Sequence, residues 1–336
     1  MNHFEGRTIL LTGGTGSFGH HFTRTALSEW NPATIRVFSR DELKQSEMQR
    51  SFNDDRLRFL IGDVRDRERL RRAVDGVDIV IHAAAMKQVP ACEYNPFEAV
   101  RTNILGTQNV AAVCIDAGIS RAVALSTDKA VSPASLYGAT KLCAEKLFVQ
   151  ANVYAGASDT RLSCVRYGNV VGSRGSVIPL FRAQATTGEL TVTDERMTRF
   201  WITLDQAVQL VADCVGTMLG GEVFVPKIPS TRVLDLAEAI APGMPVRFTG
   251  IRPGEKLHEV LITSDEARHT LDAGWCYIVA PEHPFWGTRG KQDGTPVPED
   301  FHYSSDNNTE WLTTAKLREV LAVWPPTAES PSDPGE

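Results

Sequence analysis

The stretch Thr8-Ile9-Leu10-Leu11-Thr12-Gly13-Gly14-Thr15-Gly16-Ser17-Phe18-Gly19 decides the fold of this chain of 336 residues. Its first five residues predict a buried strand, and glycines follow in the pattern G-x-x-G-x-x-G. Glycine permits a tight strand-to-helix turn and lets a pyrophosphate approach the backbone at the helix N-terminus. A tight turn alone would need the same residues, but the position at the first strand–helix junction favours a dinucleotide site. We expect its contacts from Gly13, Thr15, Gly16, Ser17, Phe18 and Gly19.

Apolar, β-prone runs alternate with helical patterns through the first half of the chain. The later runs are 35–39, 57–61, 77–81, 122–126 and 162–166. This alternation predicts an α/β fold of the Rossmann type, with a doubly wound parallel sheet. Two long helices are expected at about 96–117 and 134–155.

The pattern loosens after Gly168, where proline, glycine and short mixed segments predict a smaller C-terminal substrate-binding domain. A helix at 201–219 and a strand at 222–225 are expected to rejoin the sheet. We therefore assign residues 1–170 and 200–226 to the dinucleotide-binding domain. Residues 171–199 and 227–324 form the substrate domain in this scheme. Residues 325–336, rich in Pro, Ser, Glu and Asp, are expected to be a disordered tail.

The bulk composition limits the partners. A net charge of −6 and 42% hydrophobic residues describe an ordinary globule and argue against nucleic acid or an anionic membrane as the main partner. The six cysteines are scattered without a C-x-x-C pair, and the histidines lack metal-ligand spacing, so no metal site is expected. No signal peptide or membrane span is expected either, and the cysteines read as buried residues of a cytoplasmic protein.

Two acid–base patterns indicate catalysis. Tyr137 and Lys141 form a Tyr-x-x-x-Lys pair, one helical turn apart on one face. The ammonium can stabilise a tyrosinate and lower a phenol pKa from about 10 towards neutrality, so that the phenol takes a proton from a sugar hydroxyl beside a nicotinamide. Asp128 and Lys129 add a second pair that plain alcohol oxidation does not need. An exposed loop ion pair is the alternative, but the end of a predicted parallel strand is where such sheets bind ligands.

The end of the second predicted strand bears on the choice of dinucleotide. An acidic residue there would bind the ribose hydroxyls of NAD, whereas Ser39 and Arg40 come first here, and a guanidinium suits a 2′-phosphate. The sequence therefore predicts NADP. The alternative is that Arg40 is a solvated turn residue; Asp41 is expected to cap the next helix. The remaining expected cofactor residues are Lys44, Asp63, Val64, Ala83, Ala84, Ala85, Asn103, Tyr137 and Lys141.

Several longer motifs carry a resemblance to a known family. They are Ser39-Arg40-Asp41-Glu42-Leu43-Lys44, Ala85-Met86-Lys87-Gln88-Val89-Pro90, Thr102-Asn103-Ile104-Leu105-Gly106-Thr107, Ser126-Thr127-Asp128-Lys129-Ala130, Arg166-Tyr167-Gly168-Asn169 and Arg252-Pro253-Gly254-Glu255-Lys256. With them the chain, up to Trp311, resembles the extended short-chain dehydrogenase/reductase superfamily. Within it, the chain is most similar to the UDP-N-acetylglucosamine 4,6-dehydratases, especially the inverting type of pseudaminic acid biosynthesis. One departure is Ser135, where that family usually carries Asn.

The resemblance implies a role for each residue of the two acid–base pairs. Tyr137, activated by Lys141, takes the hydroxyl proton at carbon 4 while hydride goes to NADP+. Lys129 then removes the acidified proton at carbon 5, and Asp128 protonates the hydroxyl that leaves carbon 6. Thr127 is expected to hydrogen-bond the oxygen on carbon 4. Hydride returns to carbon 6, and reprotonation of carbon 5 from the opposite face inverts that centre.

The resemblance implies a UDP-sugar as the substrate, and the arginine guanidinium groups suit its diphosphate oxygens. The expected contacts are Lys87, Asn169, Val177, Arg199, Arg252 and Glu255, with Arg174 as a further candidate; Lys87 could equally be a solvated loop residue. Superfamily members often pair their long helices, so a homo-oligomer, at least a dimer, is expected. The alternatives are a retaining 4,6-dehydratase, a 5,6-dehydratase, a nucleotide-sugar 4-epimerase and a non-catalytic NADP-binding sensor.

Overall fold

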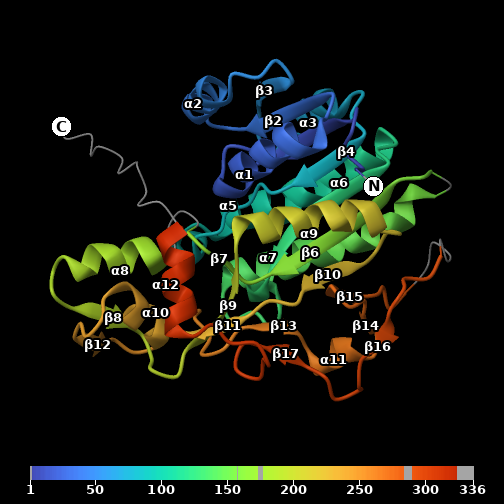
Figure 1. Ribbon diagram of the computed structural model, residues 1–336. Coiled ribbons are helices and arrows are strands. Elements are labelled where there is room, and N and C mark those ends of the chain that lie inside the picture. Colours follow the sequence, from blue (N-terminus) through green and yellow to red (C-terminus); the bar gives the residue numbers. More distant parts are fainter. Residues whose placement is uncertain (1, 157, 173–176, 284–289, 324–336) are drawn as a thin grey trace. The chain divides into compact units, whose positions relative to one another are not determined.

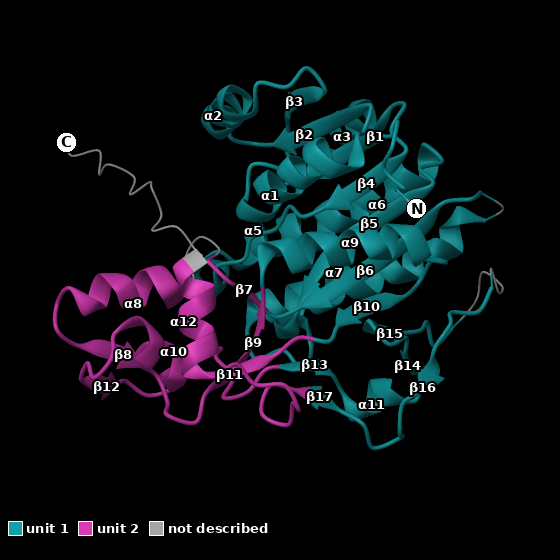
Figure 2. Ribbon diagram, viewed as in Figure 1, with its two compact units in different colours: residues 1–168, 203–227, 260–303 teal, residues 169–202, 228–259, 304–336 magenta. Residues whose placement is uncertain are grey.

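The computed structural model describes residues 2–156, 158–172, 177–283 and 290–323 (Figure 1). They fall into two compact units (Figure 2). Unit 1 comprises residues 1–168, 203–227 and 260–303, and unit 2 comprises 169–202, 228–259 and 304–336. Residues 260–303 thus belong with the first unit, although the sequence placed them in the second domain. The predicted tail at 325–336 and Arg174 lie outside the described residues.

A ten-stranded sheet forms the centre of unit 1 and confirms the expected Rossmann-type fold. Its parallel part is buried on both faces, which is why these strands read as nearly continuous apolar runs. Antiparallel strands from residues 260–303 extend it beyond β10, which explains their place in unit 1. In spatial order the strands are β16 (Thr295–Pro296), β14 (Thr270–Asp272), β15 (Cys276–Val279), β10 (Val223–Pro226), β6 (Arg161–Tyr167), β5 (Arg121–Thr127), β4 (Ile79–His82), β1 (Thr8–Thr12), β2 (Thr34–Ser39) and β3 (Leu57–Ile61).

Helices pack against the sheet of unit 1 in two groups. α1 and α9 contact each other, while α3, α6 and α7 form a row in which α7 also contacts β5 and β6. The bounds are α1 (Ser17–Thr25), α2 (Glu42–Phe52), α3 (Arg67–Val74), α4 (Val89–Tyr94), α5 (Pro96–Ala99), α6 (Gly106–Asp116), α7 (Leu136–Gln150), α9 (Leu204–Thr217) and α11 (Ser264–Ala267). β13 (Val260–Ile262) precedes α11. None of the helices in the described ranges is both long and apolar enough to cross a bilayer.

Three helices have limits that differ from those expected from the sequence. The one expected at 201–219 begins only at Leu204, because Thr203 caps it: Thr203 Oγ1 accepts from Gln206 N (3.1 Å), and Gln206 Oε1 accepts from Thr203 N (3.0 Å). The one at 96–117 is α5, a π-helical turn at Val100–Leu105 and α6. The one at 134–155 is α7 followed by a short 3₁₀ turn at Ala151–Ala155. The dimer expected from the last two stays a prediction.

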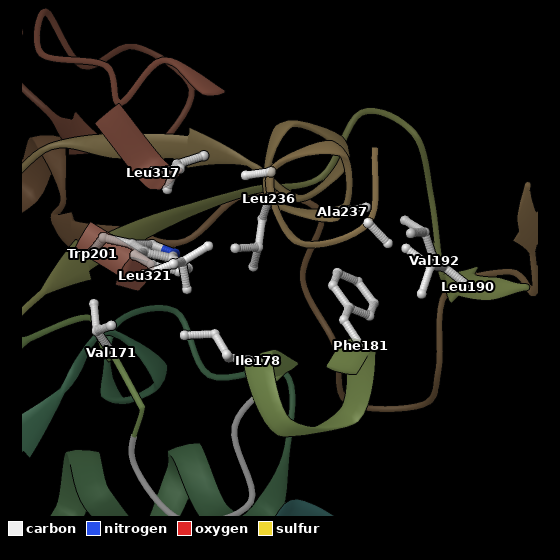
Figure 3. Packing of buried hydrophobic residues seen from close by; sticks show 12 residues of the cluster. Val171, Ile178, Phe181, Leu190, Val192, Trp201, Leu236, Ala237, Leu317 and Leu321 are labelled. Atoms are coloured by element: carbon white, nitrogen blue, oxygen red, sulfur yellow. The ribbon is translucent and has the colours of Figure 1, made fainter. Parts of the chain in front are cut away.

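Unit 2 has its own apolar core under short strands and three helices. Phe181, Trp201 and Leu236 lie in this core, each less than 5% exposed (Figure 3). The strands are β7 (Asn169–Val170), β9 (Thr198–Ile202) and β11 (Ser230–Arg232) in one sheet, and β8 (Leu190–Val192) and β12 (Val246–Phe248) in another. The helices are α8 (Val177–Ala185), α10 (Val233–Ile240) and α12 (Thr314–Val323).

Candidate active site

The loop between β1 and α1 has room for backbone and not for side chains. Gly13 has φ +68°, and a Cβ on it would lie 2.8 Å from the backbone of Ala84. A Cβ on Gly19 would lie 2.2 Å from Gly14 O. Gly16, at the N-cap of α1, brings no capping side chain to the first N–H groups. Backbone N–H groups at such a helix N-terminus bind phosphate oxygens, so the loop fits the pyrophosphate of a dinucleotide.

The ends of β2 and β3 form a mostly exposed, charged rim. Asp41 caps α2 as expected, accepting from Lys44 N (3.0 Å) and pairing with Lys44 Nζ (2.7 Å). The Arg40 side chain is 60% exposed and lies 3.8 Å from Asp63 Oδ2. Burial would raise the pKa of Asp63, but hydrogen bonds and charge from Arg65 lower it. Ser39 Oγ accepts from the buried Gln45 (3.0 Å).

A buried hydrogen-bond chain joins the glycine-rich loop to the neighbouring helix. His82 Nδ1 lies 2.7 Å from Thr12 Oγ1, and its Nε2 lies 3.0 Å from Thr107 Oγ1. Thr107 gives its only proton to Asn103 O (2.7 Å), so Nε2 donates to Thr107 and Nδ1 accepts from Thr12. Burial, and then the charge of Lys141, lower the pKa of His82 to about 3. A neutral His82 therefore fixes which atom donates and which accepts in each hydrogen bond from Thr12 to Asn103.

Asn103 clamps the loop after β4 to the helix α7. Its Oδ1 accepts from Met86 N (2.8 Å), and its Nδ2 donates to Met86 O (3.0 Å) and Thr140 Oγ1 (3.0 Å). Thr140 in turn donates to Tyr137 O (2.8 Å). The clamp ties the segment that contains Ala83–Ala85 to the helix that carries Tyr137. The expected contact of Asn103 with the cofactor stays a prediction.

The end of β5 gathers three polar side chains in a small space. Asp128 is fully buried, and its Oδ1 accepts from Thr127 Oγ1 (2.9 Å) and from Lys129 Nζ (3.0 Å). A tight turn, Asp128–Ala130, lets these neighbours converge where an extended strand would send them to opposite faces. The alternative of an exposed loop ion pair does not hold for Asp128, although the Lys129 side chain is 31% exposed.

Tyr137 and Lys141 lie one turn apart on α7, and both are buried. Lys141 Nζ donates to Leu125 O (2.7 Å) on β5. The sequence predicted a lowered phenol pKa, but burial raises the pKa of Tyr137 to about 12. The charge of Lys129 and a hydrogen bond with Thr127 oppose that increase without cancelling it. Tyr137 is therefore a neutral phenol in this structure and already contacts the residues at the end of β5.

Ser135 sets the start of the helix that carries Tyr137. Its Oγ accepts from Gly138 N (3.2 Å), and Glu93 Oε1 accepts from Leu136 N (2.6 Å). The Asn usual at this position would cap a helix equally well, so the departure preserves the local fold. The cap is visible in the sequence as a Ser two residues before Tyr137.

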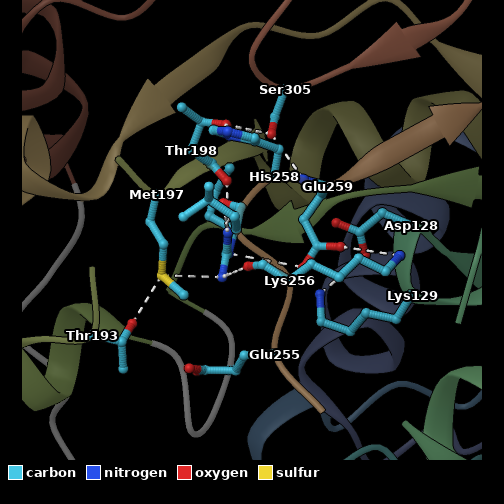
Figure 4. A network of polar contacts seen from close by, with 12 residues as sticks. Asp128, Lys129, Thr193, Met197, Thr198, Glu255, Lys256, His258, Glu259 and Ser305 are labelled. Carbon is cyan, nitrogen blue, oxygen red and sulfur yellow. Dashed lines mark hydrogen bonds and ion pairs between the residues drawn. The ribbon is translucent and has the colours of Figure 1, made fainter. Parts of the chain in front are cut away.

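In unit 2 the predicted ligand Arg199 binds protein atoms. Its Nη1 donates to Thr198 O (2.7 Å) and Leu257 O (3.1 Å), and its Nη2 donates to Lys256 O (3.1 Å). Its Nε lies 3.8 Å from Glu259 Oε1. Arg199 thus ties β9 to the segment 256–259. That segment is held again through His258, whose Nδ1 lies 2.8 Å from Thr198 Oγ1 (Figure 4).

The other predicted substrate residues differ in exposure. Arg252 is exposed and lies 3.9 Å from Glu255, Asn169 begins β7, and Val177 begins α8 at the edge of the unit 2 core. Lys87 is an exposed residue of unit 1. Their contacts with a substrate stay predictions. Sequence reasoning missed the roles of His82 and Thr140, although a lone polar residue ending the apolar strand 79–82 could have signalled the first.

Residues 9–281 match the family described as polysaccharide biosynthesis protein. The chain is 50% identical over 327 residues to an inverting UDP-N-acetylglucosamine 4,6-dehydratase of Campylobacter jejuni strain 81-176, covering 95% of this chain and 98% of the relative. It is also 43% identical to a protein of Rickettsia rickettsii named UDP-glucose 4-epimerase, over 95% of this chain and 96% of that one.

Two solved structures show the same fold. Pen from Bacillus thuringiensis has a TM-score of 0.85 and 39% identity, covering 96% of this chain and 100% of that one. DesIV, a dTDP-glucose 4,6-dehydratase from Streptomyces venezuelae with NAD and TYD bound, has a TM-score of 0.66 and 26% identity, covering 74% of this chain and 86% of that one. The chain therefore belongs to the polysaccharide biosynthesis protein family and, within the short-chain dehydrogenase/reductase superfamily, groups with the inverting UDP-N-acetylglucosamine 4,6-dehydratases.

Proposed function

We propose that the chain is an NADP-dependent dehydratase that converts UDP-N-acetylglucosamine into a UDP-4-keto-6-deoxy-hexosamine with inversion at carbon 5. The observation that carries the proposal is the hydrogen bond of 3.0 Å between the fully buried Asp128 and Lys129, next to Thr127 and Tyr137. Oxidation alone needs one base, whereas dehydration needs a second base and an acid. The 50% identity to the Campylobacter dehydratase supports the same substrate.

Tyr137 is the proposed base for the hydroxyl on carbon 4. Its phenol must lose a proton, and the pKa of about 12 makes this costly until positive charge approaches. The nicotinamide, when bound, supplies that charge and the reversible two-electron acceptor. Lys129 adds cationic charge near the phenol, and Lys141, one turn along α7, is the proposed second cation. Thr127, which hydrogen-bonds Tyr137, is proposed to orient the oxygen on carbon 4.

Asp128 and Lys129 are the proposed acid and base of the elimination. One proton separates a charged pair from a neutral pair with Lys129 as amine and Asp128 as acid. Their 3.0 Å hydrogen bond allows that proton to move between them, and burial of Asp128 disfavours the charged carboxylate. The neutral pair holds both groups that elimination needs: an amine for the carbon 5 proton and an acid for the hydroxyl on carbon 6.

NADP is proposed because Arg40 and Lys44 present two exposed cations at the end of β2. The glycine-rich loop fits the pyrophosphate of either dinucleotide, so the choice rests on this rim. A UDP-sugar is proposed to contact Lys87, Asn169, Val177, Arg252 and Glu255. Arg199 is proposed to contribute by holding β9 to its neighbouring segment, with its diphosphate contact still to be tested.

A 4-epimerase is the second candidate, since the Rickettsia relative carries that name at 43% identity. An epimerase needs Tyr137 and the cofactor but not the buried Asp128–Lys129 pair. A retaining 4,6-dehydratase and a 5,6-dehydratase would use the same residues, and they differ only in the fate of carbons 4 to 6.

Product analysis by NMR in deuterated water separates these candidates. The purified protein is incubated with UDP-N-acetylglucosamine and NADP. An inverting dehydratase gives a 6-deoxy-4-keto sugar with deuterium at an inverted carbon 5. A retained carbon 5 identifies the retaining enzyme, and an alkene at carbons 5 and 6 identifies the 5,6-dehydratase. A product that differs only at carbon 4 would reject dehydration in favour of epimerisation.

A further inference from the structure

Three ionisable residues form a buried stripe along one face of α7. Tyr137, Lys141 and Glu145 follow at intervals of four residues, and their exposed fractions are 8%, 8% and 2%. Residues four apart on a helix are neighbours, so Glu145 is positioned to form an ion pair with Lys141. In the structure Lys141 Nζ instead donates to Leu125 O (2.7 Å).

Arg166 on β6 occupies the carboxylate of Glu145. Its Nε donates to Glu145 Oε2 (3.0 Å) and its Nη2 to Glu145 Oε1 (2.6 Å), which is a two-pronged contact. The same guanidinium binds both oxygens of Glu266 (2.8 and 3.0 Å) and donates to Leu261 O (2.7 Å). The Arg166 and Glu145 side chains are each 1% exposed, so water does not weaken the contact between them.

Arg166 carries one positive charge against the two carboxylates. The ammonium of Lys141 acts on Glu145, and that of Lys146 acts on Glu266. We propose that Arg166 is a positioning residue for Lys141: by holding both oxygens of Glu145, it keeps that carboxylate from capturing Lys141 and leaves the ammonium available to Tyr137. Side chains on a helix lean towards its N-terminus, which directs Lys141 to the Tyr137 side.

The groups that face Lys141 come from every element packed against it. They are Tyr137 and Glu145 on α7, Cys164 on β6, and the neutral His82 on β4, while Arg166 acts through Glu145. Burial lowers the pKa of Lys141, while Cys164 and Glu145 raise it. Removing the charge of Glu145 should therefore lower the Lys141 pKa further. Breaking the two-pronged contact at Arg166 should raise it, because Glu145 is then released towards Lys141.

The test measures the Lys141 pKa directly, by NMR titration of protein labelled with ¹³C at the lysine ε-carbon, without nucleotide. Lys141→Arg identifies the resonance. Glu145→Gln should shift the pKa down, and Arg166→Lys, which keeps the charge but loses the planar fork, should shift it up. Glu222→Gln is the matched control, since Glu222 is equally buried (2%) but is hydrogen-bonded by Ser163 (2.6 Å). It should leave the Lys141 pKa in place.

Shifts of opposite sign support the proposal; an unchanged or raised pKa in Glu145→Gln overturns it. If Arg166→Lys does not fold, Glu266→Gln replaces it. That variant leaves Arg166 wholly to Glu145, so it should shift the Lys141 pKa down, and no shift would count against the proposal. The inference rests on the proposed catalytic role of Lys141, and the pH profile of kcat tests that role separately. NMR shifts without a moving pH profile would reject that role and leave the positioning intact.

Discussion

The ends of β5 and β2 are each followed by an Asp close to a Lys, and the two pairs differ in how far they are buried. At β5, Asp128 is fully buried and meets Lys129, whose side chain is 31% exposed, at 3.0 Å. At β2, Asp41 and Lys44 meet at 2.7 Å, but their side chains are 41% and 47% exposed. Water keeps an exposed pair ionised and weakens its attraction, whereas burial brings the neutral form of a pair within reach.

The difference assigns different tasks to the same residue types. A pair that can exchange a proton is suited to acid–base catalysis, as proposed for Asp128 and Lys129. The exposed pair stays ionised. Its cation, Lys44, is therefore suited, together with Arg40, to recognise an anionic group such as a 2′-phosphate. Residue identity at a strand end is thus less informative than the burial of that end.

The largest expected effect is at the buried pair. Lys129→Ala should slow product formation by about 10²- to 10⁴-fold, because it removes the proposed base for carbon 5. The first oxidation does not use Lys129 as its base, so reduced nicotinamide should accumulate in a single turnover followed at 340 nm. Exchange of the carbon 5 proton in deuterated water should stop.

Two variants provide the controls for that experiment. Tyr137→Phe should form no reduced nicotinamide at all, because it removes the first base. Asp128→Asn should keep the carbon 5 exchange and lose the elimination. Near-normal dehydration by Lys129→Ala would show that the pair at the end of β5 is not needed for catalysis. The proposed difference in role between the two pairs would then be wrong.

The next effect is the pH dependence of stability at the buried end. The folded pKa of Tyr137 is raised to about 12, whereas a phenol in the unfolded chain has about 10. The unfolded state therefore ionises first, and the stabilising contribution, complete below pH 10, is lost as the pH rises from about 10 to 12. The loss is about 1.4 kcal/mol per pH unit in that window.

Urea unfolding between pH 9 and 11.5 measures this slope. Tyr137→Phe should flatten it relative to the unmodified protein, and Tyr94→Phe, at a residue that is 88% exposed, serves as the control. Equal slopes in all three proteins would mean that the phenol of Tyr137 is not desolvated, and the contrast between the two strand ends would shrink accordingly.

Much of the fold was visible in the sequence because parallel strands buried on both faces are apolar throughout. All six runs of the first half overlap strands of the sheet, with β4 beginning two residues later than the run 77–81, and 222–225 rejoins the sheet as β10. The position of residues 260–303 was not predictable, because the pairing of short antiparallel strands such as β14 depends on partners distant in the sequence. The beginning of α9 was missed because Trp201 fits an apolar helix pattern equally well, and Thr203 was not recognised as its cap.

In the candidate site, the sequence predicted how some residues are placed but not how they are ionised. The four-residue spacing of Tyr137 and Lys141 places them correctly, since helix geometry is local. The pKa of Tyr137 depends on total burial, which no local pattern reports. The hydrogen-bond chain through His82 and Asn103 was invisible for the same reason, because its members are brought together only by the sheet.

At the exposed end, Arg40→Ala should weaken NADP binding about 10- to 100-fold, which corresponds to the loss of a charge-assisted contact of about 1.5 to 3 kcal/mol. NAD binding should change little. Calorimetry with both dinucleotides measures the difference, and it should shrink as salt rises, because exposed charges are screened. Arg50→Ala, on the same helix as Lys44, is the control for general charge loss. Equal losses for NADP and NAD would show that Arg40 does not read the 2′-phosphate.

The smallest expected effect separates the helix cap from the ion pair at the same residue. Asp41 caps α2 by accepting from Lys44 N (3.0 Å), and Asp66 caps α3 by accepting from Arg69 N (2.9 Å). Each replacement by Ala should cost about 1 kcal/mol of unfolding free energy, because each leaves a helix N–H group without its side-chain partner. The additional ion pair of Asp41 with Lys44 should add little, since both side chains are exposed. Urea titrations of Asp41→Ala and Asp66→Ala should therefore agree within about 0.5 kcal/mol. A much larger loss for Asp41→Ala would show that the exposed pair is strong despite its exposure, and burial would then no longer explain why the ends of β2 and β5 differ.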